Sequence, residues 1–446
     1  MSVRSAGEIF GEAETLALYL GIEVALAHAQ AEVGVIPEDA AREIERGATL
    51  DAIDVPRVRQ EAQRTGYAVA PLVRQLTEAC GDAGRFVHWG ATTQDIVNTA
   101  LALQVDEAFR GVLERVERLA RALAALVRSH RHSVMAGRTF GGHALPITFG
   151  FKAAVWLSSV LRHAERVRAA VARPIPGEFA GAAGTLASLQ EQGLAVRRAF
   201  MRRLRLPEPT ITWAAMRDEV FVRVAALAGL TNSLAKIAQD IAELGSTEIG
   251  EVAEPHAGGK DTSSTLPLKA NPILCAHTVA AATLVGQNAM SVLLAGRQRQ
   301  ERSGEALLEL QVVGPAFIAA ERCLDLAVLL LEDLQVFPSR MRRNLDGTRG
   351  VMLGERFMMA LAPRLGRLQA HDLVHEACRA AIERDVPLES VLAEIPAVVE
   401  VLSNAELQAL ADPATYLGSA DAMCAAVLQQ ASSVIPEAAH ELATDP

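Results

Sequence analysis

Hydroxyl side chains, a lysine and a helix start lie close together between residues 258 and 272 of this chain. The segment reads GGKDTSSTLPLKANP, and its glycines and small hydroxyl residues do not favour a stable helix or strand. Asn271 and Pro272 are a good N-cap and a favoured first residue for a helix over the apolar run 273–294. Free backbone amides, the helix dipole and the Lys269 ammonium would then converge where an anion could bind. The alternative is an ordinary Gly/Ser loop before a capped helix.

The order Ser-Ser-Thr-Leu-Pro-x-Lys-x-Asn-Pro in this segment resembles the signature loop of the fumarase/aspartase superfamily. Other segments resemble further motifs of that superfamily, in order, over nearly the whole chain. The first has the form shared by adenylosuccinate lyases and 3-carboxy-cis,cis-muconate cycloisomerases, and the last three are similar to the cycloisomerase branch. These segments are Val87–Asp95, Gly137–Thr139 with Pro146–Gly150, Glu178–Ala187, Met341–Asp346 and Asp412–Gly418.

Enzymes of this superfamily remove a proton from a carbon beside a carboxylate and expel a group from the neighbouring carbon, often leaving fumarate. The resemblance implies that Ser263 is the general base, acting as an alkoxide, and a plain loop hydroxyl is the alternative. Serine is a poor base in water and needs a cationic, amide-lined setting to lower its pKa. Lys269 would bind the carboxylate and stabilise the developing dianion, unless it is a solvated loop lysine. Asn271 would hold the same carboxylate or only cap the helix.

The resemblance also implies substrate-binding residues outside the signature loop. Arg138 and Thr139 belong to the second substrate-binding segment. The hydroxyl groups of three threonines would donate to carboxylate oxygens or would only stabilise turns: Thr92, Thr93 and Thr185. Arg217 and Arg302 match arginines of the family, and a guanidinium suits planar, bidentate carboxylate binding. Each arginine could instead form a structural ion pair with its neighbouring acid.

This sequence departs from the family at four places. Most members carry Thr-His-x-Gln in the second segment, but here Phe140 stands at the position of the histidine that usually assists the leaving group. The cycloisomerase branch has His-Lys-Arg around the catalytic lysine, where this chain has Leu268 and Ala270. The segment 213–216 lacks the His and Gln common in that branch, and Lys260-Asp261 lengthen the loop. We predict that His143, beside two glycines, donates a hydrogen bond or proton to the departing group, and a structural histidine is the alternative.

The lost polar groups favour a substrate with fewer carboxylates than a muconate. We therefore expect a lyase that forms fumarate from a substituted succinate by β-elimination, with nitrosuccinate as the best single substrate, because nitrite is a good leaving group that needs little acid assistance. A 3-carboxy-cis,cis-muconate cycloisomerase is the alternative. A catalytically silent structural relative is a second alternative, against which the intact Ser263 and Lys269 argue.

Long apolar helices must position these residues. Half of the 446 residues are hydrophobic but only 4% are aromatic, which predicts close-packed helices and an all-α fold. Leu227, Leu230, Leu234, Ile237, Ile241 and Leu244 form a heptad-like seam. Long helices are expected over 105–131, 147–171, 217–246, 273–299 and 304–334.

These helices are apolar on several faces, so we expect burial between subunits. The resemblance implies a three-domain chain in a homotetramer whose helices merge into one central bundle, with active sites shared between chains. The expected domains are an N-terminal helical domain of short helices (1–105), the long-helix bundle with the catalytic loop (106–340) and a C-terminal helical domain (341–446).

Charge and composition exclude several classes of partner. The formal net charge of -10, without a basic run, argues against nucleic acid and anionic membranes. The N-terminus resembles no signal peptide and no apolar run approaches about 18 uninterrupted residues, so we expect a cytoplasmic protein without a membrane span. Five scattered cysteines indicate free thiols rather than a metal site. No metal and no organic cofactor is expected, and the partner is a small dicarboxylate.

Overall fold

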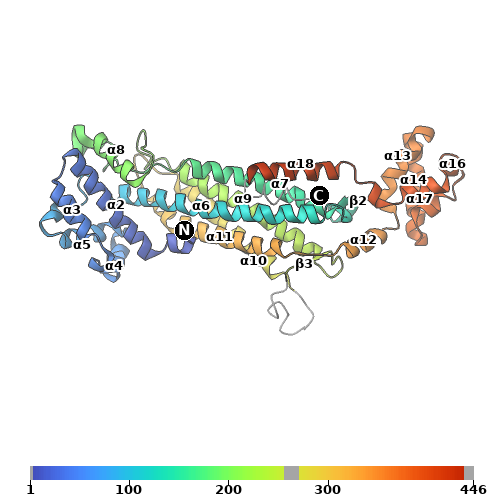
Figure 1. The fold of residues 1–446 in the computed structure, drawn as a ribbon, viewed down its shortest axis with the longest axis horizontal. Helices are drawn as coiled ribbons and strands as arrows, with labels where there is room; N and C mark the ends of the chain where they lie inside the picture. Colours follow the sequence, from blue (N-terminus) through green and yellow to red (C-terminus); the bar gives the residue numbers. More distant parts are fainter. Residues whose placement is uncertain (1–3, 256–270, 436–446) are drawn as a thin grey trace. The chain divides into compact units, whose positions relative to one another are not determined.

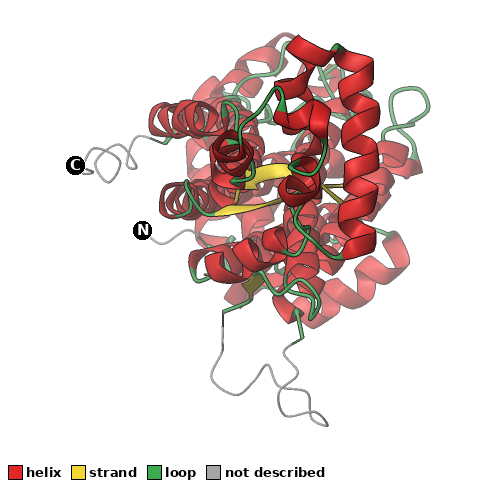
Figure 2. Cartoon of the chain, turned by 90° about the vertical axis from the view of Figure 1, so that its right-hand side faces the viewer, coloured by secondary structure: helices red, strands yellow, loops and turns green. Residues whose placement is uncertain are grey.

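The computed structural model describes residues 4–255 and 271–435, and helices dominate the described chain (Figure 1). Figure 2 shows the helices in red with only short strands in yellow. The predicted all-α fold is confirmed. The chain divides into two compact units, each made of three separate stretches of sequence. The boundaries of the three expected domains stay a prediction, because these units do not follow chain order.

The first unit comprises Met1–Arg115, His163–Leu234 and Ala280–Asp325. Its core gathers apolar side chains of the N-terminal helices and of α8, including Leu20, Leu26, Ile44, Leu72 and Phe200. The helices lying wholly within this unit are α1 (Ala6–Ile9), α2 (Glu12–Val33), α3 (Glu38–Gly47), α4 (Val55–Thr65), α5 (Val69–Ala79) and α8 (Gly193–Leu204), with 3-10 turns at Leu50–Ala52, Gly81–Phe86, Ala187–Gln192 and Gly304–Ala306.

The second unit comprises Val116–Arg162, Ala235–Val279 and Leu326–Pro446. Its C-terminal helices enclose a core around Phe357, Leu361, Ala381 and Leu392. The helices that contribute to this core are α12 (Pro338–Asp346), α13 (Gly354–Leu365), α14 (Arg367–Arg384), α15 (Leu388–Leu392), α16 (Pro396–Val399) and α17 (Asn404–Leu410), with the 3-10 turn Val351–Leu353. The unit also contains α18 (Ala420–Val434) and a 3-10 turn at Pro413–Thr415. Two antiparallel pairs complete the unit: β1 (Val134–Thr139) with β2 (Gly142–Thr148), and β3 (Val252–Ala253) with β4 (Gln335–Val336).

Each of the five predicted long helices is present, and each contributes residues to both units. The predicted seam on α9 is buried from Leu227 to Leu244. The bounds are α6 (Thr93–Ser129), α7 (Phe149–Ala172), α9 (Asp218–Leu244), α10 (Ile273–Ala295) and α11 (Leu307–Glu332). α6 begins 12 residues before its expected start, because the Asp95 carboxylate accepts a hydrogen bond from the Thr92 amide (2.9 Å) and caps the helix there.

Two expectations about these elements were wrong. The region 1–105 holds the 22-residue helix α2 rather than only short helices. Residues 134–146, assigned to no regular element, and residues 147–148, expected at the start of a long helix, form a hairpin with the two-residue turn Phe140-Gly141. Both turn residues have positive φ, 51° and 79°, as the turns favoured in two-residue hairpins require. A phenylalanine at positive φ is uncommon, which is why the pattern of residue types did not reveal the turn.

By length and composition alone, α2, α9 and α10 could each cross a membrane. The sequence expectation that excluded membrane spans required an uninterrupted apolar run. That criterion was too strict, because polar residues interrupt the apolar run in each of these helices, and in α2 and α9 some of them are charged. Between 39% and 50% of each apolar window is buried inside the structure. The rest of each window is apolar helix surface that the described chain does not fully cover.

Candidate active site

Thr92 and Arg302 share a small pocket in the first unit. Arg302 donates to the Thr92 hydroxyl (3.3 Å) and to the Ala182 carbonyl (3.4 Å). The pocket has a volume of about 90 Å³, and the start of α6, the segments 180–184 and 212–215, and Glu301 with Arg302 form its walls. Arg302 makes no ion pair with Glu301 or with any other carboxylate of the described residues. Its charge is therefore available to an anion beside a threonine hydroxyl.

The Asp95 carboxylate holds two walls of this pocket together. It accepts hydrogen bonds from the backbone amides of Thr92 (2.9 Å), Ala180 (3.0 Å) and Gly181 (3.1 Å). The third wall, residues 212–215, packs closely against Gly184, where a Cβ would lie 2.7 Å from the Thr212 side chain. The φ of Gly184 is +89°, which also favours glycine. Thr93 is the half-buried first residue of α6, and Thr185 is exposed just beyond this wall.

Two acids beside the pocket have perturbed pKa values for the same first reason, burial. Burial raises the pKa of Asp95, although three amide hydrogen bonds and the charge of His88 oppose the shift. Burial also raises the pKa of Glu178, to about 7, against one amide hydrogen bond from Trp213, the Thr212 hydroxyl and the charge of Arg217. Glu178 is 1% exposed and is therefore a buried acid that is partly neutral at neutral pH.

Arg217 lies in the same unit but is committed to a buried ion pair. Its Nε atom lies 3.1 Å from both carboxylate oxygens of Glu309, and its Nη1 donates to Asn98 (2.9 Å). Its guanidinium also stacks over the Trp213 ring at 4.6 Å. These contacts agree with the alternative that Arg217 forms a structural ion pair, but its partner is Glu309 rather than the adjacent Asp218. Substrate binding by Arg217 stays a prediction.

The β1–β2 hairpin carries Arg138, Thr139 and His143 in the second unit. Arg138 donates to both carboxylate oxygens of the buried Glu251 (2.9 and 2.7 Å), and Asn344 donates to Glu251 as well (2.8 Å). Thr139 and Phe140 are exposed at the tip of the hairpin. Arg138 is therefore held in an ion pair, whereas Thr139 is free to meet a ligand.

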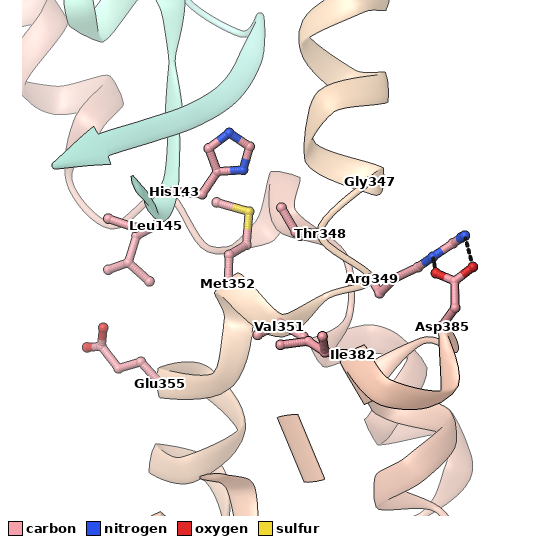
Figure 3. A pocket seen from close by; sticks show the side chains of 11 residues that line it. His143, Leu145, Gly347, Thr348, Arg349, Val351, Met352, Glu355, Ile382 and Asp385 are labelled. Atoms are coloured by element: carbon pink, nitrogen blue, oxygen red, sulfur yellow. Dashed lines mark hydrogen bonds and ion pairs between the residues drawn. The ribbon is translucent and has the colours of Figure 1, made fainter. Parts of the chain in front are cut away.

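His143 faces a different environment from Thr139. Cross-strand partners share one face of a hairpin. Because His143 pairs with Arg138 while Thr139 pairs with Gly142, the side chains of His143 and Thr139 lie on opposite faces. His143 lines a cavity of about 750 Å³ together with Leu145, Met352 and Glu355 (Figure 3). Partial burial and the positive charge of Arg138 lower the pKa of His143, so the neutral imidazole dominates at neutral pH.

The start of α10 differs from the anion site that the sequence suggested. The first-turn backbone amides of α10 already have an acceptor, because the Glu254 carboxylate accepts hydrogen bonds from the amides of Leu274 (3.0 Å) and Cys275 (2.8 Å). The expectation that this helix N-terminus offers unpaired amides to a substrate was therefore wrong, since the chain supplies its own anion there. Asn271 is half-buried directly before the helix, next to the segment that carries Ser263 and Lys269. Those two residues lie outside the described residues.

Acidic residues account for most of what the sequence analysis missed. In the first unit, Glu178 and Glu309 fix a pocket wall and Arg217, and in the second unit, Glu251 and Glu254 fix Arg138 and the start of α10. Glu178 stood inside a quoted motif, and a carboxylate in an otherwise apolar, glycine-rich run is a signal that could have found it. The described residues contain no group of three or more His, Cys, Asp or Glu side chains that could hold a metal ion.

Comparison with known proteins assigns the family. The sequence profile of the family described as Lyase matches residues 3–286, and the one described as Adenylosuccinate lyase C-terminus matches residues 350–427. A solved structure described as fumarate lyase from Mesorhizobium sp. BNC1 is 44% identical, with 96% of this chain and 99% of that chain covered and a TM-score of 0.89.

Three curated relatives span almost all of the chain. Trans-aconitate decarboxylase 1 of Mycosarcoma maydis is 40% identical, covering 96% of this chain and 87% of its own. The 3-carboxy-cis,cis-muconate cycloisomerase of Acinetobacter baylyi is 37% identical, covering 96% of each. Nitrosuccinate lyase of Streptomyces davaonensis is 40% identical, covering 92% and 89%. The chain therefore belongs to the fumarase/aspartase superfamily, in the branch with the muconate cycloisomerases and nitrosuccinate lyase, and it is an enzyme of the lyase or cycloisomerase kind.

Proposed function

We propose that this enzyme is a lyase that forms fumarate from a substituted succinate, with nitrosuccinate as substrate and nitrite as the second product. Ser263 takes the proton from the carbon beside one carboxylate. The carbon–nitrogen bond then breaks with its electron pair leaving on nitrite, and the carbon–carbon double bond of fumarate forms. Lys269 and Arg302 balance the carboxylate charge that grows in the transition state.

The residue at position 140, a phenylalanine, is the observation that supports nitrite as the leaving group. It stands where most of the superfamily has the histidine that assists the departing group, and it lies fully exposed at the hairpin tip with a φ of +51°. A benzyl side chain has no proton to give. A group that leaves as a stable anion, such as nitrite, needs no proton, whereas an amine does.

A 3-carboxy-cis,cis-muconate cycloisomerase is the second candidate function. The relative of that name covers 96% of this chain, and an apolar residue at the position of Phe140 is also common in that branch. Leu268 and Ala270 favour the first proposal, because they stand where the cycloisomerases have cationic neighbours of the catalytic lysine for a tricarboxylate. The silent structural relative is set aside because the chain is an enzyme of this family, and turnover of either substrate tests this directly.

A homotetramer is the assembly that we propose for the chain. Large apolar side chains on α10 and α11 are two-fifths or more exposed in the single chain, among them Leu284, Met290, Leu310, Ile318 and Leu329. Burial against other copies explains these surfaces without a membrane. Ser263, the proposed base, is not among the described residues that line the Thr92–Arg302 pocket, and we propose that segments of other copies complete the site. We further propose that the enzyme is cytoplasmic. Light scattering that finds an active monomer would contradict the shared site.

The proposed reaction is tested by ultraviolet absorbance with a panel of substrates. The purified enzyme is given nitrosuccinate, aspartate and 3-carboxy-cis,cis-muconate, and fumarate formation and loss of muconate absorbance are followed separately. We expect rapid fumarate formation from nitrosuccinate only. In Phe140→His, elimination of the amine of aspartate should increase, while Phe140→Leu serves as the matched control that restores no proton. Turnover confined to the muconate would establish the cycloisomerase instead.

A further inference from the structure

Two buried carboxyl groups tie together the walls of the pocket that contains Thr92 and Arg302. Asp95 binds the start of α6 to the segment 180–184, as described above. Glu178 binds the next wall, because its Oε2 accepts from the Trp213 amide (2.9 Å), between two lining residues of the segment 212–215. The Trp213 indole also donates to the Gly177 carbonyl (3.2 Å). The two segments are therefore joined directly through Glu178 and its neighbour.

The two carboxyl groups differ in the number of donors that face them. Asp95 receives three amide hydrogen bonds, which stabilise a negative charge in a buried place. Glu178 receives one amide hydrogen bond, from Trp213, beside the contribution of the Thr212 hydroxyl, and its Oε1 is buried and accepts no hydrogen bond from the described part of the chain. A buried carboxylate with an unpartnered oxygen is costly. The arrangement therefore favours a charged Asp95 and a proton on Glu178.

The backbone at Glu178 is fixed independently of its carboxyl group. The Thr99 hydroxyl accepts from the Glu178 amide (2.9 Å) and donates to the Glu178 carbonyl (2.8 Å). The charged groups that face the carboxyl are Asp95 on α6 and Arg217 at the start of α9, and the guanidinium of Arg217 is already engaged by Glu309. Among the described residues, no cation without a carboxylate partner therefore faces an ionised Glu178.

We propose that Glu178 is a positioning residue of the substrate pocket, and that its protonated carboxyl group holds the wall 212–215 in place for an anionic substrate. Among the described residues, the charged side chains that line the pocket are the cation Arg302 and the acids Asp95 and Glu301. An ionised Glu178 adds a further buried negative charge to this balance. An ionised Glu178 would still accept from the Trp213 amide, but its buried, unpartnered Oε1 would have to be hydrated, which requires water to enter beside the wall. Loss of the proton therefore loosens the wall, and the added negative charge disfavours dicarboxylate binding. The inference rests on the proposed function only in taking the pocket to bind a dicarboxylate.

The test measures the state of the wall and the affinity for succinate separately. Trp213 fluorescence is titrated from pH 5.5 to 8.5 in the full chain with Trp89→Phe and Trp156→Phe, so that only Trp213 emits. Succinate binding is measured by calorimetry over the same range in the otherwise native enzyme. Both experiments compare Glu178 with Glu178→Gln, which imitates the protonated carboxyl group, and with Glu178→Ala, which removes it. Glu191→Gln is the matched control, because Glu191 is exposed in a 3-10 turn near the same segment.

We expect a Trp213 transition near pH 7 that is absent in Glu178→Gln. The Kd for succinate should rise by roughly tenfold per pH unit above that transition, the limit for one linked proton, and should stay within about twofold in Glu178→Gln. Glu178→Ala should bind succinate weakly at every pH. A transition that persists in Glu178→Gln, or a Glu178→Gln enzyme that binds as poorly as Glu178→Ala, would overturn the proposal. An enzyme that binds no succinate contradicts the proposed function, while the fluorescence titration still decides the role of Glu178.

Discussion

Arg217→Met should destabilise the protein strongly, and the reason lies in the burial of its partner. Arg217 is 3% exposed and Glu309 is 0% exposed, with the Arg217 Nε 3.1 Å from both carboxylate oxygens. Removing the arginine leaves the Glu309 charge buried without its cation, which costs on the order of 3–5 kcal/mol. The loss of the hydrogen bond to Asn98 and of the stacking on Trp213 adds to this cost.

The double variant Arg217→Met with Glu309→Leu separates an ion pair from a substrate ligand. Replacing both charges by apolar groups of similar size removes the unpaired charge and is often close to neutral. We therefore expect the double variant to recover most of the stability lost in Arg217→Met. The assay is urea denaturation of the four members of the cycle, with succinate affinity measured on the same samples.

A surface pair provides the control for this cycle. Arg118 donates to both carboxylate oxygens of Glu332 at 2.6 Å, but both side chains are at least one-third exposed. Breaking it should cost roughly 0–1 kcal/mol. The reasoning is refuted if Arg217→Met costs no more than Arg118→Met. A stable double variant with a tenfold weaker affinity for succinate would instead assign Arg217 to the substrate.

Five further outcomes are expected. Ser263→Ala should abolish proton abstraction in a steady-state assay. A residual kcat above about a tenth of the wild type, which corresponds to an increase of less than ~1.4 kcal/mol in the barrier, would show that Ser263 is not the base. Lys269→Met should impair both substrate binding and turnover. His143→Gln should remove the limb on which the rate falls as pH rises through the His143 pKa, and this limb should lie below the ordinary value of ~6.5 because the fold lowers that pKa. Identical profiles would make His143 structural. Glu254→Ala should lower the free energy of unfolding by about 1–3 kcal/mol, since two first-turn amides of α10 lose their acceptor, and Glu254→Gln should lose less. The fold raises the pKa of Glu178 from 4.5 to about 7, so the stabilising contribution of its proton is complete below pH 4.5 and is lost as pH rises through 7. In urea titrations, the free energy of unfolding of the wild type should fall by up to about 3 kcal/mol relative to Glu178→Gln between pH 4.5 and 8.

Helical periodicity made most of the fold predictable from the sequence. The spacing of Leu227, Leu230 and Leu234 identified α9, and these positions are buried as expected. The hairpin at residues 134–148 could not be found in this way, because its strands are short and its turn puts a phenylalanine at positive φ. The compact units were equally hidden, since each long helix belongs to both of them and the sequence shows only one continuous helix.

The candidate site was predictable only where a residue type suits a ligand. Hydroxyl and cationic residues such as Thr92 and Arg302 were recognised, and the structure brings these two together. The sequence could not show that Arg217 and Arg138 are paired with Glu309 and Glu251, because each partner is more than 90 residues away along the chain. Residues that position other residues have no ligand-binding signature of their own. Glu254, whose carboxylate binds the first-turn amides of α10, is the clearest case.

The ratio of products formed from nitrosuccinate tests the proposed reaction most directly. Proton NMR measures fumarate and a colorimetric assay measures nitrite in one reaction mixture, with the Ser263→Ala enzyme as the blank. The elimination predicts equal amounts of fumarate and nitrite from the wild type and neither product from Ser263→Ala. An enzyme that leaves nitrosuccinate unchanged but converts 3-carboxy-cis,cis-muconate to its lactone would contradict the elimination.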